Sequence, residues 1–428
     1  MLAFAALCVA LISMKPLIMD ELLTLIAVRQ PTLSDVLART REHAGNVPLG
    51  FVLENLSLRL TGYSIWFARL PWAVWGIATL IAFGALARKL RAPSPLLAII
   101  LFAAFPQTLR YALEIRPYMP ALLFSILLTI LFLKLADRAT LGLALAYALL
   151  VAATLYTLPF AAFVCGAHFL WAAIYKKWRA TAYIAAASVA AVAAFVPWYL
   201  SARSAWHEEM TVRFIRFSIN AKSPLLLFRE VTGAGYWGMG VIVILCILGI
   251  ARARMDRPTL TLLLLLIAVP FAAGLLADAV FGYFLAARQF LWILPALAIL
   301  AASAWETRPR ETTALALLAI AISGYKSARY FTQLEPDYEA AAKAIAQEVD
   351  RGACFRVVPD ISKQLYVYFA PRIAMDSGNC SAVVAAVVPG FSDQDRDVLF
   401  NDLTRRGYTK LRTGEVGETA ITTFRKPD

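Results

Sequence analysis

Charged residues are scarce in this chain. Asp, Glu, Lys and Arg make up 16% of its 428 residues, whereas hydrophobic residues make up 61%. A soluble protein of this length needs a far more polar surface, so the composition excludes an ordinary soluble globular enzyme. The mean hydropathy of +0.67 and the many long apolar segments are typical of a polytopic α-helical membrane protein.

Several motifs that indicate common chemistries are also missing. The sequence has no zinc-ligand spacing, no phosphate-binding glycine loop, no internal repeat and no nucleic-acid-binding motif. The net charge is +13, and it is unevenly spread: residues 335–428 hold 12 Lys/Arg and 14 Asp/Glu, so residues 1–334 carry about +15. A basic membrane part with a nearly neutral tail predicts contacts with anionic membrane lipids and no nucleic-acid partner.

Apolar length predicts about eleven transmembrane helices. They lie near residues 1–19, 69–87, 96–112, 117–134, 141–157, 159–175, 180–200, 235–251, 259–277, 284–303 and 312–329. Loops rich in Lys and Arg, such as residues 88–91 and 176–179, alternate with loops that are poor in them. By the positive-inside rule the amino terminus is cytoplasmic, and an odd number of spans places the tail outside.

The pattern changes near residue 335, which predicts a transmembrane domain over residues 1–334 and a small extracytoplasmic α/β domain over residues 335–428. Helices are expected at 337–350 and 393–406, and short strands at CFRVVP, QLYVYF and AVVAAVVP. Cys354 and Cys380 lie near predicted strand ends, so an extracytoplasmic tail would allow a disulfide between them.

Asp20 and Glu21 directly follow the first apolar segment and open a long polar loop, residues 20–68. Charge is costly beside hydrocarbon, so acids at a membrane edge have either a function or a solvated position. Apolar residues recur at helical spacing in this loop, which predicts two or more short amphipathic helices along the interface. Such helices would frame a cavity between water and lipid, which a lipid-linked substrate requires.

Four segments, taken in order, carry a resemblance to a known family. They are the Asp20-Glu21 pair, HAGNVPLGFVLENLSLRLTG followed by FARLPWAVWG, YALEIRPYMPAL (111–122) and ARQFLWILPAL (287–297). They resemble the GT-C superfamily of membrane glycosyltransferases, in the branch of protein O-mannosyltransferases and lipid A aminoarabinose or galacturonosyl transferases. The chain departs from this family at Asn46-Val47-Pro48, where a His-Pro-Pro run is usual, with His43 three residues earlier. The Trp-Trp-Asp-rich motif of oligosaccharyltransferases is absent, which argues against block transfer to asparagine.

The resemblance implies a transferase in the bacterial inner membrane that moves one hexosyl or pentosyl unit from a polyprenyl-phosphate donor. The acceptor would be a glycolipid, a cell-envelope polysaccharide or a protein on the extracytoplasmic face. Asp20 is expected to be the general base, because an acceptor hydroxyl is a poor nucleophile, and Glu21 to orient the acceptor or Asp20. One base without a covalent intermediate implies inversion at the anomeric carbon. No cofactor is required, and adjacent carboxylates leave the use of a divalent metal open.

The departing phosphate needs positive charge or hydrogen-bond donors. Arg288 is the first candidate because it begins a late span at the predicted outer face, and Arg116 in a short outer turn is the second. Further candidates for substrate binding are His43, Asn46, Tyr111, Glu114 and Tyr118.

Simpler explanations stay open for each of these residues. The two acids could sit in water at the end of a span, and Arg288 could reach lipid headgroups. Glu114 could pair with Arg116, and His43 could be solvated or cap a helix.

Two other functions stay open for the whole chain: a transporter or flippase of a lipid-linked sugar, and a non-catalytic GT-C relative. Transporters usually place ionisable residues near mid-membrane in repeated halves, whereas here the acids lie at one surface and no repeat is found. A transferase is therefore the favoured function. Trp and Tyr residues near predicted span ends, among them Tyr236 and Trp237, are typical of an interfacial belt.

Overall fold

The structure is a computed structural model of the chain, and it describes residues 1–42, 46–212, 222–252, 255–281, 286–333, 336–374, 380–388 and 393–427. Its contacts define two compact units. The helical unit contains residues 1–12 and 30–330, and the mixed unit contains residues 13–29 and 331–428. Residues 13–29 thus group with the tail, although the sequence predicted them within the transmembrane domain.

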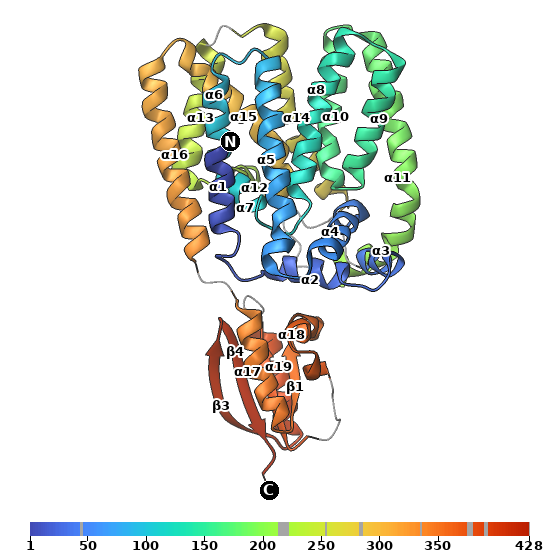
Figure 1. Cartoon of the computed structure of the whole chain (residues 1–428), viewed down its shortest axis with the longest axis vertical. Helices are drawn as coiled ribbons and strands as arrows, with labels where there is room; N and C mark the ends of the chain where they lie inside the picture. Colours follow the sequence, from blue (N-terminus) through green and yellow to red (C-terminus); the bar gives the residue numbers. More distant parts are fainter. Residues whose placement is uncertain are drawn as a thin grey trace. The chain divides into compact units, whose positions relative to one another are not determined.

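The helical unit is a bundle of α-helices joined by short connections (Figure 1). Its α-helices are α1 (Leu2–Leu11), α3 (Leu33–Arg41), α4 (Pro48–Thr61), α5 (Ile65–Lys89), α6 (Pro95–Ala104), α7 (Pro106–Tyr111), α8 (Tyr118–Asp137), α9 (Leu141–Leu155), α10 (Val164–Ile174), α11 (Trp178–Val212), α12 (Ser223–Thr232), α13 (Gly235–Arg252), α14 (Arg257–Phe281), α15 (Leu294–Ser303) and α16 (Pro309–Thr332). Its 3-10 helices are η1 (Pro159–Phe163), η2 (Ala287–Ile293) and η3 (Ala304–Glu306).

Within the described residues, five segments are long and apolar enough to cross a membrane, which makes the chain an integral membrane protein. They are Ile65–Lys89, Tyr118–Asp137, Trp178–Trp206, Arg257–Val280 and Ala287–Glu306. A sixth candidate is bent by 88° between Ser223–Thr232 and Gly235–Ala251.

The predicted number of about eleven spans is not confirmed. Four predicted segments contain helices that are short against the roughly 20 residues that a span requires: Leu2–Leu11, Pro95–Ala104, Leu141–Leu155 and Pro159–Ile174. The predicted span 96–112 is divided at Pro106, which begins the separate helix α7. Proline has no amide hydrogen to continue a helix, so it interrupts an apolar run that length alone suggests is continuous.

The loop at residues 20–68 contains short helices, as predicted from its apolar spacing. Helix α3 begins at a capping box, in which the Asp35 amide donates to Thr32 Oγ1 and the Thr32 amide donates to Asp35 Oδ2. Helix α4 begins with Pro48, whose missing amide hydrogen costs nothing in a first turn. Local capping signals therefore determine where these helices start.

Two glycines allow the late helices to pack closely around η2. A Cβ atom at Gly249 of α13 would lie 2.0 Å from the Leu300 carbonyl oxygen of α15. A Cβ atom at Gly274 of α14 would lie 2.3 Å from the Phe290 ring of η2. Only glycine permits such close approaches, so Gly249 allows α13 to pack against α15 and Gly274 allows α14 to pack against η2.

The mixed unit contains a four-stranded sheet with strand order β1-β2-β4-β3. The strands are β1 (Ala353–Val358), β2 (Ala382–Val387), β3 (Thr409–Val416) and β4 (Thr419–Arg425). Strands β1 and β2 pair in parallel, and the other pairs are antiparallel. The helices are α2 (Met19–Val28), α17 (Tyr338–Asp350), α18 (Lys363–Phe369), α19 (Asp393–Arg405), η4 (Asp360–Ser362) and η5 (Pro371–Ala374).

The small α/β tail is confirmed in outline, with one wrong element and two missed ones. QLYVYF, predicted as a strand, forms helix α18, in which Tyr366 packs edge-on against Tyr338 and Phe355. Six residues are too few to separate a strand from one helical turn by their apolar pattern. Strands β3 and β4 were not predicted, because β3 is almost wholly exposed and shows no apolar alternation. They form a hairpin whose turn places Gly417 and Glu418 at positive φ.

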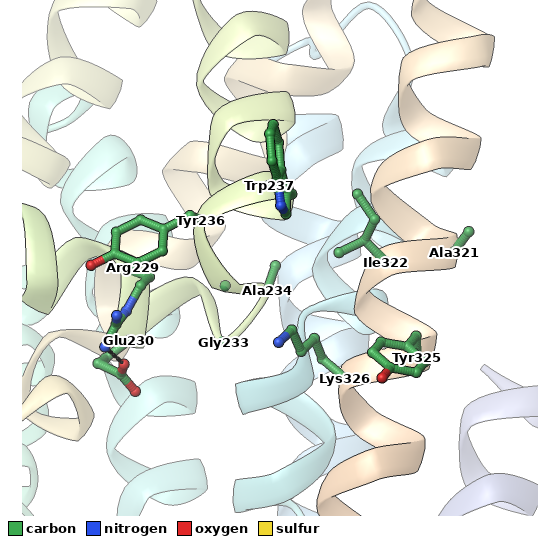
Figure 2. Close-up of a pocket in the computed structure, with 11 residues that line it drawn as sticks. Arg229, Glu230, Gly233, Ala234, Tyr236, Trp237, Ala321, Ile322, Tyr325 and Lys326 are labelled. Carbon is green, nitrogen blue, oxygen red and sulfur yellow. Dashed lines mark hydrogen bonds and ion pairs between the residues drawn. The ribbon is translucent and has the colours of Figure 1, made fainter.

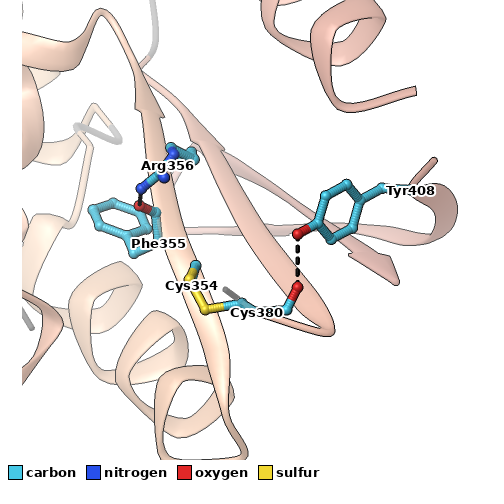
Figure 3. The surroundings of a disulfide bond; sticks show 5 residues. All are labelled: Cys354, Phe355, Arg356, Cys380 and Tyr408. Carbon is cyan, nitrogen blue, oxygen red and sulfur yellow. Dashed lines mark hydrogen bonds between the residues drawn. A yellow bond between two sulfur atoms is a disulfide. The ribbon is translucent and has the colours of Figure 1, made fainter. Parts of the chain in front are cut away.

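Cys354 of β1 and Cys380, just before β2, form a disulfide with their Cα atoms 5.7 Å apart (Figure 3). The Tyr408 hydroxyl donates a hydrogen bond of 2.6 Å to the Cys380 carbonyl oxygen. Leu403 and Phe424 pack in the same buried cluster. The pairing that the sequence left open is therefore present, and Cys8, Cys165 and Cys246 are buried free thiols.

Candidate active site

The chain turns sharply between α6 and α8, and this turn carries four of the predicted site residues, Tyr111, Glu114, Arg116 and Tyr118. Pro106 starts the short helix α7, which ends at Tyr111. The loop that follows folds tightly, because the Arg116 amide donates to the Glu114 carbonyl and the Tyr118 amide to the Arg116 carbonyl. Four polar side chains from a short stretch of sequence are thereby held close together.

Glu114 is buried and forms an ion pair with Arg110. Arg110 Nε lies 2.7 Å from Glu114 Oε1, and the Tyr330 hydroxyl of α16 donates to the same oxygen at 3.3 Å. The Arg110 guanidinium also lies over the Tyr330 ring, 4.8 Å from its centroid. Glu114 thus forms an ion pair with Arg110, a residue that the sequence analysis did not name as a candidate.

Tyr118 brings the two predicted phosphate-binding arginines near one aromatic ring. The Arg116 guanidinium carbon lies 5.9 Å from the Tyr118 ring centroid, and that of Arg288 lies 6.0 Å from it. The Tyr111 and Tyr118 rings are 4.7 Å apart in an edge-on arrangement, and both are buried. We call Arg110, Tyr111, Glu114, Arg116, Tyr118, Arg288 and Tyr330 the Arg–Tyr cluster.

The electrostatics of the cluster suit an anionic ligand. Three arginines belong to the cluster, Arg110 paired with Glu114 and the other two beside the buried Tyr118 ring. Burial raises the pKa of Tyr111 well above its usual value, although the nearby Arg110 guanidinium acts in the opposite direction. The Tyr111 hydroxyl therefore stays protonated as a hydrogen-bond donor, which an anion can accept.

Arg288 is placed by a short capping motif at the start of η2. The Gln289 side chain accepts a hydrogen bond from the Ala286 amide, and the Gln289 amide donates to the Ala286 carbonyl. The next residue, Phe290, contacts α14 at Gly274. The backbone that carries Arg288 is thus held from both sides.

The acidic pair belongs to the mixed unit, where it forms the first turn of α2. The Ile18 amide donates a hydrogen bond of 3.1 Å to Glu21 Oε2, and Glu21 is only 1% exposed. Asp20 is partly exposed, and its carbonyl accepts a hydrogen bond from the Thr24 hydroxyl. The alternative that both acids simply sit in water is therefore wrong for Glu21.

The two remaining candidates for substrate binding are His43 and Asn46. His43 lies outside the described residues. The Asn46 carbonyl accepts a hydrogen bond from Trp198 Nε1 of α11 at 3.4 Å. Where the structure describes the chain, it shows no group of three His, Cys, Asp or Glu residues that could hold a metal ion.

Sequence reasoning missed two members of the cluster, Arg110 and Tyr330. Arg110 directly precedes the YALEIRPYMPAL segment, and its spacing of four residues from Glu114 was an available signal for an ion pair. Tyr330 comes from the last helix of the unit, and nothing in its local sequence separates it from an ordinary interfacial tyrosine. Only the packing of α16 beside α7 reveals it.

Comparison with solved structures identifies the fold. ArnT from Cupriavidus metallidurans in the apo state matches with a TM-score of 0.60 and 14% identity, over 99% of this chain and 97% of that chain. ArnT from the same organism bound to undecaprenyl phosphate matches with a TM-score of 0.61 and 13% identity, over the same shares. The chain has the GT-C fold of ArnT.

This fold is the one that the four sequence segments predict. At 13–14% identity the GT-C likeness is one of fold alone. No family model matches the chain, and no curated protein matches it.

Proposed function

We propose that the chain is a GT-C glycosyltransferase that takes a monosaccharide from a polyprenyl-phosphate donor. The observation that supports this most directly is the Arg–Tyr cluster, in which residues 110–118 meet Arg288. Two of the four segments that resemble the GT-C family thus lie together in this cluster of arginine and tyrosine side chains. The fold is shared with ArnT, one structure of which is bound to undecaprenyl phosphate.

The cluster has the chemistry that a phosphate leaving group requires. Arg116 and Arg288 supply positive charge, and Tyr111 supplies a neutral hydrogen-bond donor. Preorganised donors of this kind stabilise the negative charge that develops as the bond to the sugar breaks. Arg110 is held by Glu114 and completes the rim of the site.

We further propose Asp20 as the general base. The acceptor oxygen attacks the anomeric carbon, the bond from that carbon to the phosphate oxygen breaks, and polyprenyl phosphate leaves. The proton of the acceptor hydroxyl passes to the Asp20 carboxylate, and the sugar is inverted because no covalent enzyme intermediate forms. Glu21 positions this turn, since its carboxylate binds the Ile18 amide.

The acceptor would be a glycolipid, a polysaccharide or a protein at the extracytoplasmic face of the inner membrane. This part of the proposal follows the resemblance and the positive-inside rule. The proposed transfer requires no cofactor, and two adjacent carboxylates are compatible with catalysis with or without a divalent ion.

The test is a transfer assay on purified protein in nanodiscs. A panel of polyprenyl-phosphate sugars is offered with crude envelope extract as the acceptor source, and released polyprenyl phosphate is measured by mass spectrometry. We expect release by the wild type and not by Asp20→Asn, while Asp397→Asn, at an exposed ion pair in α19, behaves as wild type. No release from any donor would refute the transferase, and near-normal release by Asp20→Asn would refute the base. Movement of the lipid-linked sugar across vesicles without bond cleavage would favour the flippase instead.

A further inference from the structure

A second polar feature of the helical unit is a pocket of about 750 Å³ between α16 and the α12–α13 pair (Figure 2). Its wall includes Arg229 and Glu230 of α12, Tyr236 and Trp237 of α13, and Tyr325 and Lys326 of α16. The resemblance and the proposed function assign no role to any of these residues.

The pocket exists because α12 and α13 meet at a sharp break. Gly233 and Gly235 both have positive φ, near +69° and +68°, and the two helices are bent by 88°. A Cβ atom at Gly235 would lie 3.0 Å from Lys326 Cε. Glycine here both permits the backbone turn and leaves room for the lysine, which Figure 2 shows reaching from α16 toward the break.

The pocket carries a net positive charge. Arg229 pairs with Glu230 and lies over the Tyr236 ring, 4.7 Å from its centroid. Lys326 has no ion pair among the residues that the structure describes. Two cations and one carboxylate leave one positive charge, which matches the single negative charge of a phosphodiester.

The aromatic side chains of the pocket are strongly exposed. Trp237 is 85% exposed and Tyr325 is 63% exposed, on helices of a membrane protein. Amphipathic aromatic rings are enriched at the level of lipid headgroups, where one edge meets hydrocarbon and the other meets polar groups. Basic side chains at the same level attract anionic lipids. The combination favours a lipid headgroup over a fully soluble anion.

The pocket borders the Arg–Tyr cluster but uses different cations. Lys326 precedes Tyr330 by one helical turn, so both lie on one face of α16. The Gln107 side chain donates to the Glu230 carbonyl, and Gln107 lies one turn before Arg110 in α7. Two neighbouring cationic sites are what an enzyme with two anionic lipid ligands would need.

We propose that this pocket binds the phosphate-bearing headgroup of an anionic membrane lipid, at a site separate from the donor phosphate. Its separateness rests on the proposed function, which places the donor phosphate at the Arg–Tyr cluster. Arg229 and Lys326 bind the phosphate oxygens, and Tyr236, Trp237 and Tyr325 pack against the glycerol backbone or upper acyl chain.

The experiment measures lipid binding to the full chain by native mass spectrometry, with phosphatidylglycerol and phosphatidylcholine as probes. The test variant is Arg229→Gln with Lys326→Gln. The matched control is Lys177→Gln with Arg179→Gln, because both residues are exposed and Arg179 also lies over a tyrosine, Tyr183. We expect the wild type to prefer phosphatidylglycerol. Each lost cation should weaken that binding about fivefold, so the test variant should bind on the order of twentyfold more weakly.

Three outcomes would overturn the proposal. The first is equal affinity of wild type and test variant for phosphatidylglycerol. The second is displacement of the lipid by inorganic phosphate alone, which would indicate a site for soluble anions. The third is an equal loss of polyprenyl phosphate affinity in the test variant, which would make the pocket part of the donor site.

Two features make this test independent of folding and of catalysis. Lys326→Arg keeps the charge and should retain phosphatidylglycerol binding, whereas Lys326→Gln should weaken it. If Lys326 had only a structural role, the two variants would bind phosphatidylglycerol equally. The assay needs no sugar transfer, so an absence of transferase activity leaves its result interpretable.

Discussion

Tyr118, the first residue of α8, lies 6.0 Å from the guanidinium carbon of Arg288 in η2, measured to its ring centroid. The two residues come from segments that are far apart in the chain, and both segments carry the GT-C resemblance. Two of the four segments are therefore neighbours in the structure. Their proximity also makes Arg288 the residue whose substitution tests the cluster most directly.

We predict that Arg288→Gln weakens polyprenyl phosphate binding by about tenfold to a hundredfold, since hydrogen bonds to charged groups contribute ~1.5–3 kcal/mol. The affinity of Arg288→Lys should lie between those of the wild type and Arg288→Gln, because a lysine keeps the charge but loses the planar fork of donors. The measurement is a titration of polyprenyl phosphate in nanodiscs, with Arg308→Gln, at an exposed ion pair with Glu311, as the control. Unchanged affinity in Arg288→Gln would remove Arg288 from the donor site.

Glu21 and Asp20 should respond differently to truncation, because Glu21 is buried and binds the Ile18 amide whereas Asp20 is partly exposed. Glu21→Ala should lower the free energy of unfolding by about 1–2 kcal/mol, and Asp20→Ala by clearly less. Thermal unfolding of both variants, followed by circular dichroism, checks this. Equal destabilisation by the two substitutions would show that Glu21 has no special structural role.

Glu114→Gln should destabilise the helical unit by leaving the Arg110 guanidinium beside a neutral amide. The expected loss is ~1–3 kcal/mol, less than for a fully buried pair because the Arg110 side chain is 32% exposed. Arg110→Gln combined with Glu114→Gln should recover part of this loss, because the double variant removes both charges and leaves no unpaired guanidinium. Glu339→Gln, at the exposed pair with Lys343, serves as the control and should change stability by less than ~0.5 kcal/mol. Additive effects in the double variant would argue against the pair.

The Cys354–Cys380 disulfide closes a loop with a sequence separation of 26, and its loss should lower the stability of the mixed unit by ~2–4 kcal/mol. We expect Cys354→Ser with Cys380→Ser to be cleaved faster in limited proteolysis within residues 331–428. A reducing agent should accelerate cleavage of the wild type and leave the double variant unchanged. A response of the double variant to the reductant would point to another cysteine.

Several elements were predictable because their signals are local. The capping residues of α3, the proline that starts α4, and the apolar runs of α5, α8 and α14 each act over a few neighbouring residues. Two helices of the tail, α17 and α19, and two of its strands, β1 and β2, followed from their apolar periodicity. QLYVYF shows where this reasoning ends, since its six residues fit a strand as well as the helix that packing on Tyr338 and Phe355 selects.

The number of membrane spans was less predictable, because apolar composition does not report where a helix breaks. Pro106 divides the segment 96–112, whose hydropathy suggests a simple span, and the Gly233–Gly235 break adds the bent helix α12 before the predicted span 235–251. Neighbouring helices pack against these breaks, and their side chains form hydrogen bonds with backbone groups there. The Gln107 side chain, for example, donates to the Glu230 carbonyl. Such compensation depends on residues that lie far away in sequence.

The sequence by itself determined that this is a helical membrane protein with a small α/β tail, since composition and periodicity are properties of the local chain. It also offered Arg116 and Arg288 as candidates for binding the donor phosphate, and Tyr111, Glu114 and Tyr118 as candidates for binding substrate. Only the tertiary structure decided that Glu114 pairs with Arg110, that Tyr330 joins them, and that Lys326 lines a second pocket. These contacts are set by the packing of α16 against α7 and α13, and packing between distant helices leaves no periodic trace in any one of them.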